Sequence, residues 1–186
     1  MTSVNQQPRK KPIVQKKICM LGSFAVGKTS LVARFVRSIF SEAYHTTVGV
    51  KIDKKVVELA SARVKLILWD LHGEDEFQRL QTTYLRGSAG YVLVVDGTRR
   101  DTLESAASLH ERARAAVGPV PYTLAINKSD LLDMWEIEEA DLEPWRARDA
   151  VIARTSAKTG AGVEELLVEL AARTLGVGRG QAVGES

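Results

Sequence analysis

The chain has 186 residues, of which 45% are hydrophobic and 26% charged, and it carries a formal net charge of +3. This length fits one ordinary globular domain with a full hydrophobic core. The sequence contains no apolar run of about 18 residues, so it predicts no membrane-spanning helix.

The positive charge is concentrated at the N-terminus. Residues 1–17 hold five basic residues and no acid, and without those five the acidic residues outnumber the basic ones. A tail rather than a basic groove therefore accounts for the high pI, which argues against nucleic-acid binding by the globular part. We expect residues 1–15 to form a solvated, disordered arm, with weak contact to an anionic lipid or an acidic partner as the alternative. The single cysteine, Cys19, lies in an apolar run and is expected to be buried, which suits a reducing, cytoplasmic location.

Strand-like and helix-like segments alternate along the chain. The first strand is expected at 17–21, and a hairpin follows with strands at 50–59 and 63–70. The remaining strands are expected at 90–96, 122–127 and 151–155, and the helices near 28–38, 76–87, 102–117, 137–148 and 162–175. This order predicts an α/β fold with a six-stranded, mostly parallel sheet, one antiparallel edge strand and about five flanking helices. Residues 16–175 would form the domain, and the glycine-rich residues 176–186 a frayed tail.

A glycine-framed loop, GSFAVGKTS, occupies residues 22–30 between the first strand and the first helix. Its pattern G-x-x-x-x-G-K-[ST] turns backbone N–H groups toward an anion at the positive end of a helix. Lys28 would reach the β- and γ-phosphates, and the Thr29 hydroxyl would bind Mg²⁺. The alternative is an ordinary glycine turn. The loop predicts binding of a nucleoside triphosphate by Gly22, Ala25, Val26, Gly27, Lys28, Thr29 and Ser30.

A second polar motif, Asn127-Lys128-Ser129-Asp130, stands at the end of an apolar run, where open α/β sheets bind their ligands. With this motif and the phosphate loop at this spacing, the chain resembles the Ras-superfamily small GTPases, closest to the Rab branch. The resemblance implies a P-loop NTPase G domain. It also implies that Asp130 accepts hydrogen bonds from guanine, whose donors adenine lacks. Asn127 would support the base and the phosphate loop, and the stem of Lys128 would pack on the ring.

Further motifs follow the resemblance in order. Ser156-Ala157-Lys158 matches the loop in which a backbone N–H, here that of Ala157, meets the guanine carbonyl oxygen. Phe40, twelve residues past Lys28, stands where the family places an aromatic edge against the base. The alternative for Phe40 is a core residue at the end of a helix.

The two nucleotide-sensing switches are also recognisable by resemblance. The segment from Tyr44 to Val50 corresponds to switch I, and its Thr47, eighteen residues after Thr29, would close over Mg²⁺ and the γ-phosphate. The segment from Trp69 to Glu74 corresponds to the start of switch II, in which Asp70 would hold Mg²⁺ through a water and the Gly73 N–H would contact the γ-phosphate. Loss of that phosphate would release both segments.

Three residues depart from the family pattern. Glu74 replaces the glutamine that orients the attacking water, which removes an amide donor and adds repulsion on the order of 2–4 kcal/mol beside the phosphates. Phe24 occupies a phosphate-loop position that is usually small, and its ring would crowd an activator's arginine; the alternative is packing against switch II. His72 replaces a small residue and either assists the water or shapes the turn. We therefore expect slow hydrolysis, with Lys28, Gly73 and Glu74 as the catalytic candidates.

The resemblance implies a Mg²⁺-dependent GTP/GDP switch that signals to effectors and regulators through its switches. The alternative is a guanine-nucleotide-binding interaction module with negligible turnover, and a P-loop kinase or ATPase is disfavoured by Asn127 and Asp130. The partner surface would be the switches together with strand 50–59, made basic by Lys51, Lys54 and Lys55. No prenylation cysteine stands near the end of the chain, so no stable lipid anchor is expected, as in bacterial Ras-like GTPases.

Overall fold

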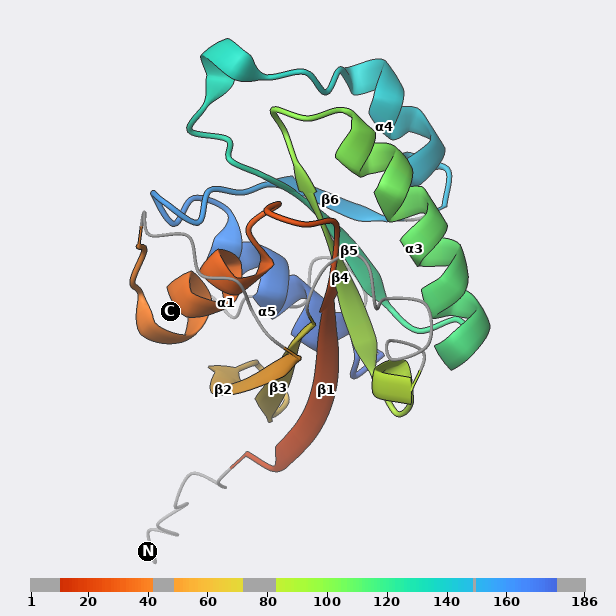
Figure 1. Ribbon diagram of the computed structural model, residues 1–186. Coiled ribbons are helices and arrows are strands. Elements are labelled where there is room, and N and C mark those ends of the chain that lie inside the picture. The colour runs from red at the N-terminus through yellow and green to blue at the C-terminus, as the bar shows by residue number, and fades with distance from the viewer. Residues whose placement is uncertain (1–10, 42–48, 72–82, 149, 177–186) are drawn as a thin grey trace, which may run out of the picture.

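The computed structural model describes residues 11–41, 49–71, 83–148 and 150–176. These residues form one six-stranded sheet in the order β2-β3-β1-β4-β5-β6, flanked by helices (Figure 1). Only the β2–β3 pair is antiparallel, and β2 lies at an edge. The predicted fold is therefore confirmed.

The helices and strands have the following bounds in the described residues. The elements are β1 (Ile13–Leu21), α1 (Lys28–Arg37), β2 (Val50–Glu58), β3 (Arg63–Leu71), β4 (Gly90–Asp96), α3 (Asp101–Val117), β5 (Tyr122–Asn127), the 3₁₀ helix η1 (Leu132–Met134), α4 (Glu139–Arg146), β6 (Val151–Arg154) and α5 (Val163–Arg173).

Several element boundaries differ by a few residues from the sequence prediction, and two of them have a clear physical reason. Strand β1 begins at Ile13 rather than at residue 17, so residues 13–15, assigned to the N-terminal arm, belong to the sheet. Ile13 and Gln15 are exposed and Val14 is only half-buried, but Ile13 lies opposite Arg63 and the segment takes its strand conformation by pairing with β3. Helix α4 begins at Glu139 rather than at residue 137, because the Asp141 carboxylate accepts the Glu138 N–H at 2.9 Å and fixes the helix start there.

The predicted helix 76–87 lies mostly outside the described residues, of which 83–85 are helical. In the described part of the chain, no helix is both long and apolar enough to cross a membrane.

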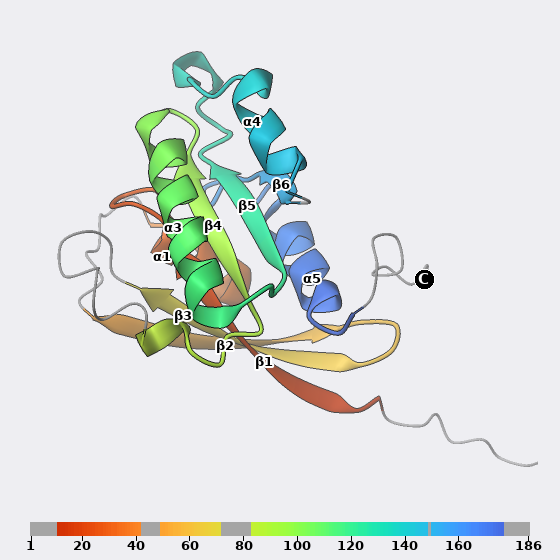
Figure 2. The same cartoon turned by 90° about the vertical axis from the view of Figure 1, so that its right-hand side faces the viewer.

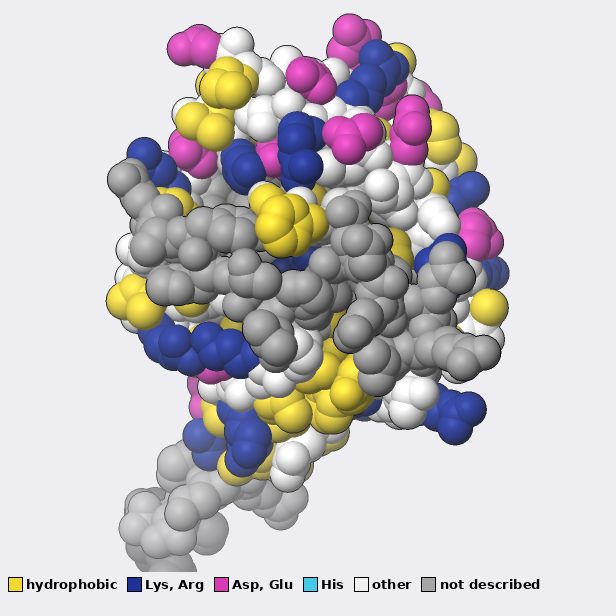
Figure 3. Space-filling model, viewed as in Figure 1, with side chains coloured by type: hydrophobic (Ala, Val, Ile, Leu, Met, Phe, Trp, Pro, Cys, Tyr) yellow, Lys and Arg dark blue, Asp and Glu magenta, His cyan; other side chains and the backbone are white. Residues whose placement is uncertain are grey.

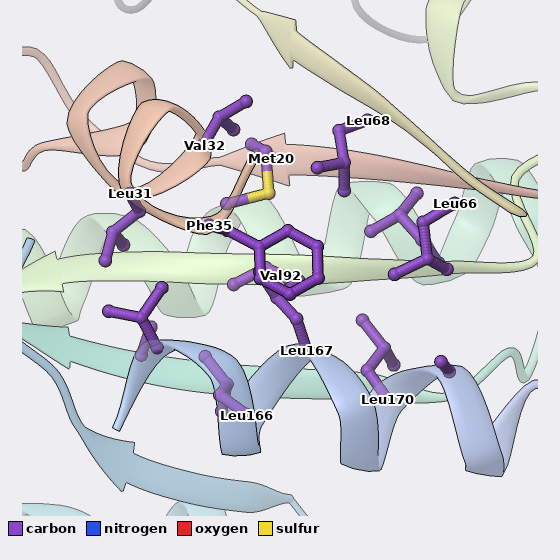
Figure 4. Packing of buried hydrophobic residues seen from close by; sticks show 14 of the residues in the cluster. Met20, Leu31, Val32, Phe35, Leu66, Leu68, Val92, Leu166, Leu167 and Leu170 are labelled. Carbon is purple, nitrogen blue, oxygen red and sulfur yellow. The ribbon is translucent and has the colours of Figure 1, made fainter. Parts of the chain in front are cut away.

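The sheet is covered on both faces, which explains the continuous apolar character of its central strand. All seven residues of β4 are buried. Helices α1 and α5 pack on one face, where the Phe35 ring lies among side chains of the sheet and α5 (Figure 4). Helices α3 and α4 cover the other face (Figure 2). Each helix contributes an apolar stripe, and burial of these stripes is the main force that holds the layers together.

A buried aromatic cluster stands in the second core. His110 of α3 is 1% exposed and packs against the rings of Tyr91, Tyr122 and Trp145. Its Nδ1 lies 2.9 Å from the Tyr91 hydroxyl oxygen. Removal from water disfavours the imidazolium and lowers the pKa of His110 below its ordinary value. No chemical role follows from the sequence around His110, and the structure gives it a packing role.

The parallel arrangement gathers the predicted motifs at one edge of the sheet. Strands β1, β3, β4, β5 and β6 end on the same side, and Met20 lies opposite Asp70, as Asp96 lies opposite Asn127. Polar residues that are far apart in sequence therefore meet where the strands end.

Candidate nucleotide-binding site

The phosphate loop joins β1 to α1 in a conformation that favours anion binding. Gly27 precedes the helix with a φ of 100°, and Lys28 is the first helical residue. Ala25, which is not a glycine, also has a positive φ of 60°. Such a turn followed by a helix start directs backbone N–H groups toward one point, at the positive end of the helix dipole.

The two framing glycines are required by close contacts. A Cβ on Gly22 would lie 2.3 Å from the Val94 carbonyl oxygen, and one on Gly27 would lie 2.3 Å from Asn127 Nδ2. Both approaches are too short for any side chain, so the loop can lie against β4 and the Asn127 amide only with glycine at these positions.

Lys28 lies inside the loop rather than in solvent. It is 7% exposed, and its Nζ donates to the carbonyl oxygens of Gly22 at 2.7 Å and Ser23 at 2.8 Å. A buried cation held at the centre of an anion cradle fits the predicted role of Lys28 in neutralising phosphate charge.

Thr29 and Asp70 are brought together from α1 and the end of β3. Thr29 Oγ1 donates to Asp70 Oδ2 at 2.5 Å, and Asp70 is 1% exposed. A hydroxyl and a carboxylate are the hard oxygen ligands that Mg²⁺ prefers, with phosphate oxygens and waters completing its coordination. The described residues contain no cluster of three or more metal-binding His, Cys, Asp or Glu side chains. The pair therefore fits a magnesium ion held jointly with a bound phosphate, rather than an ion held by protein groups alone.

Asn127 connects the phosphate loop to the loop after β6. Its Nδ2 donates to the Val26 carbonyl oxygen at 2.9 Å. Its Oδ1 accepts from the Ala157 N–H at 3.2 Å and from Thr155 Oγ1 at 3.4 Å. Asn127 is 2% exposed, so a single buried amide links three segments of the site.

Other residues predicted to recognise the base lie close to Asn127 in the structure. Asp130 Oδ1 accepts the Ser156 hydroxyl proton at 2.5 Å, and this bond joins the two predicted guanine loops. Arg34 of α1 donates to the Ala157 carbonyl oxygen at 2.7 Å and also to the Lys158 carbonyl. The role of Arg34 was missed by the sequence reasoning, because this contact spans 123 residues of sequence.

Asp96, at the end of β4, was also missed. It is 1% exposed, and its Oδ2 accepts from Lys128 Nζ at 2.6 Å. Burial alone would raise the pKa of Asp96, but the Lys128 ammonium and bonds from Thr98 outweigh it, so the pKa lies below its ordinary value. Its position offered a signal, since Asp96 follows an apolar strand in the same way as Asp70 and Asn127.

Two aromatic residues near the site are partly exposed. Phe40 lies beyond the end of α1 and is 37% exposed, which excludes the alternative of a core residue. Phe24 is 41% exposed, so its ring is open to solvent while its backbone belongs to the phosphate loop.

The other predicted residues lie outside the described part of the chain. These are Tyr44 and Thr47 of switch I and His72, Gly73 and Glu74 of switch II.

A glycine-framed phosphate loop, a hydroxyl–carboxylate pair and an N-K-x-D loop at one sheet edge define a P-loop protein of the guanine-nucleotide-binding class. Comparison with known proteins identifies the family. Residues 17–175 match the Ras family, and the chain belongs to it. It is 34% identical over 160 residues to the Ras-related protein Rab-22A of Homo sapiens, covering 84% of this chain and 82% of that protein. It is 33% identical over 162 residues to the Ras-related protein RABF2b of Arabidopsis thaliana, covering 86% and 81%.

A third relative, the Ras-related protein Rab-4 of Dictyostelium discoideum, is 32% identical over 161 residues, covering 86% of this chain and 78% of that protein. The chain is thus a Rab-like small GTPase, a GTP-binding hydrolase of the molecular-switch type.

Proposed function

We propose that this small GTPase is a Mg²⁺-dependent switch that hydrolyses GTP slowly and signals to protein partners through switches I and II. The observation that carries the Mg²⁺ dependence is the 2.5 Å contact between Thr29 Oγ1 and Asp70 Oδ2, beside the phosphate loop. In this proposal Thr29, Asp70 and Thr47 hold the ion, which neutralises charge on the β- and γ-phosphates when bound.

The nucleotide is bound and oriented by groups of this chain. Backbone N–H groups of residues 22–30 hold the phosphates, and the Lys28 ammonium neutralises their oxygens. Asp130 accepts two donors of guanine, while Asn127 keeps the base loop and the phosphate loop at a fixed separation. This division predicts selectivity for guanine over adenine, because adenine lacks the two donors that Asp130 would accept.

Slow hydrolysis is the part of the proposal that follows from Glu74 and Phe24. Glu74 accepts a hydrogen bond from the attacking water but cannot donate to the phosphate, and its charge opposes that of the nucleotide. In this proposal the Phe24 ring, which is 41% exposed, crowds the arginine that an activating protein would insert. Phe24→Gly should therefore raise hydrolysis in the presence of an activator, and an unchanged rate with and without candidate activators would remove this role.

The partner surface in this proposal is the outer face of the β2–β3 hairpin beside the switches. Ile52 of the edge strand is 46% exposed and pairs with Trp69, over whose ring Lys17 Nζ lies at 3.9 Å from the centroid. Figure 3 shows hydrophobic side chains gathered over this part of the sheet, with basic side chains beside them. Lys55, expected on the same basic edge, instead turns to the opposite face and pairs with Glu164 at 2.7 Å. The partner would thus meet an apolar centre with a basic margin.

The alternative function is a guanine-nucleotide-binding module with negligible turnover, favoured by Phe24 and Glu74 together. Identifying the nucleotide that copurifies and following its cleavage over hours in Mg²⁺ separates the two. Conversion of bound GTP to GDP supports the slow switch, whereas intact GTP after many hours supports the module. Tighter binding of ATP than of GTP would contradict both.

A further inference from the structure

The turn between β4 and α3, residues 96–100, lies between the phosphate loop and the base loop. Its first residue, Asp96, is a buried carboxylate with four donors. Oδ1 accepts from the Thr98 N–H at 3.0 Å and from the Thr98 hydroxyl at 2.7 Å. Oδ2 accepts from Arg99 Nε at 3.1 Å and from Lys128 Nζ at 2.6 Å. Asp96 therefore fixes both its own turn and the second residue of the base loop.

Arg99 extends this network to the phosphate loop. While its Nε is bound to Asp96, its Nη2 donates to the Phe24 carbonyl oxygen at 2.8 Å. The planar guanidinium can hold two acceptors at a fixed geometry, which a lysine ammonium cannot reproduce. One side chain thus bridges a buried carboxylate and the backbone of the phosphate loop.

Each of the two loops that this network reaches contains a residue in a costly left-handed backbone conformation. Ala25, whose N–H belongs to the Phe24 peptide group, has a φ of 60°, and Lys128 has a φ of 67°. Left-handed conformations are unfavourable for residues with a Cβ and persist only where surrounding contacts hold them. Arg99 contacts the first strained segment, and Asp96 contacts the second.

The turn itself is firmly anchored. The Gly97 N–H donates to the Asn127 carbonyl oxygen at 2.9 Å, and Thr102 Oγ1 accepts the Asp96 N–H at 3.0 Å. The Gly97 carbonyl accepts the Glu136 N–H at 2.8 Å from the segment after η1. Because the turn is anchored, its contacts can hold both loops in place, whereas a loosely held turn would move together with the loops.

We propose that Asp96 and Arg99 are positioning residues that hold the phosphate loop and the base loop in the nucleotide-binding shape. Arg99 acts on the phosphate loop alone, and Asp96 acts on both loops through Arg99 and Lys128. This proposal rests on the proposed assignment of the nucleotide site to these loops. Contacts that hold the two loops in this shape lower the ordering cost that nucleotide binding would otherwise carry.

The test compares Arg99→Met, Asp96→Asn and the double variant with Arg100→Met as matched control. Arg100 is the adjacent basic residue, but its guanidinium pairs with Asp141 rather than with the phosphate loop. The measurement is the release rate of fluorescent GDP from the full chain, together with the preference for GDP over inosine diphosphate, which lacks the 2-amino group.

We expect Arg99→Met to release GDP about fivefold faster with an unchanged base preference. Asp96→Asn should release it about thirtyfold faster and lose part of the preference for GDP, because Lys128 and the base loop are freed. The double variant should resemble Asp96→Asn, since the two residues belong to one network. Arg100→Met should behave as wild type, and its thermal unfolding sets the baseline for general destabilisation.

Three results would overturn the inference. The first is wild-type GDP release in Arg99→Met and Asp96→Asn. The second is an equal acceleration of GDP release in Arg100→Met, which would indicate general destabilisation. The third is a fall of about a hundredfold in single-turnover GTP cleavage in Arg99→Met without faster release, which would make Arg99 a catalytic residue. If the wild-type chain itself fails to retain GDP, the proposed nucleotide site fails, and that outcome is distinct from all three.

Discussion

Replacing Asn127 by alanine removes the amide that joins three segments of the nucleotide site. The two shorter bonds, from Nδ2 to the Val26 carbonyl at 2.9 Å and from the Ala157 N–H to Oδ1 at 3.2 Å, lie in a buried environment. A buried hydrogen bond of this kind contributes about 1–1.5 kcal/mol, so the pair contributes about 2–3 kcal/mol. If this energy holds the loops in place for the nucleotide, GDP release should accelerate roughly 30- to 150-fold.

The assay is release of fluorescent GDP, with thermal unfolding of the nucleotide-free chain measured in parallel. Thr155→Val is the matched control, because it removes only the 3.4 Å bond to Asn127 Oδ1, near the upper limit for a hydrogen bond. We expect this control to change release by less than about threefold. Release from Asn127→Ala within about threefold of wild type would refute the reasoning, as would an equal effect of both variants.

The remaining predictions concern hydrolysis, the metal and acid stability. Glu74→Gln should raise single-turnover GTP cleavage about tenfold, measured by rapid quench, and an equal or slower rate would contradict the assigned role of Glu74. Chelation of Mg²⁺ should accelerate GDP release from wild type but hardly from Thr29→Val, which lacks the hydroxyl proposed to bind the ion. Equal acceleration in both proteins would exclude Thr29 as a ligand. The folded state depresses the pKa of His110, so the unfolded chain binds more protons below pH 6.5 and stability is lost as the pH falls through that value. The pH dependence of the unfolding free energy should therefore be less steep in His110→Phe than in wild type, by at most about 1.4 kcal/mol per pH unit; parallel curves would contradict this.

The fold was predictable because its strands are buried on both faces and its loops carry strong local signals. The apolar run of β4 and the glycines at positions 22 and 27 are properties of short segments, readable without knowledge of distant contacts. The start of β1 was not predictable, because Gln15 and Lys16 become strand residues through pairing with β3.

The supporting contacts of the site were not predictable for the same reason. Arg99 and Phe24 are 75 residues apart, and Arg34 and Ala157 are 123 residues apart. No local pattern encodes such a pair. Only the position of Asp96 at a strand end gave a hint, and that hint does not identify its partners.

In the proposed function, the site divides into a part that binds GTP and GDP equally and a part able to distinguish GTP from GDP. Asn127, Asp96 and Arg34 connect loops that would contact the base and the inner phosphates, which both nucleotides share. A ligand shifts a conformational equilibrium only by its differential affinity for the two states, so these contacts set retention and not switching.

In this proposal the part that distinguishes GTP from GDP lies beside the Thr29–Asp70 pair, at one end of the β2–β3 hairpin. There Val50 pairs with Leu71, which places the end of switch I and the start of switch II on neighbouring strands. The pair Ile52 and Trp69 lies two residues further along the same hairpin. Only a few residues of one antiparallel strand pair therefore separate the γ-phosphate position from the proposed partner surface. A conformational change at the γ-phosphate can reach that surface along the hairpin, without passing through the core.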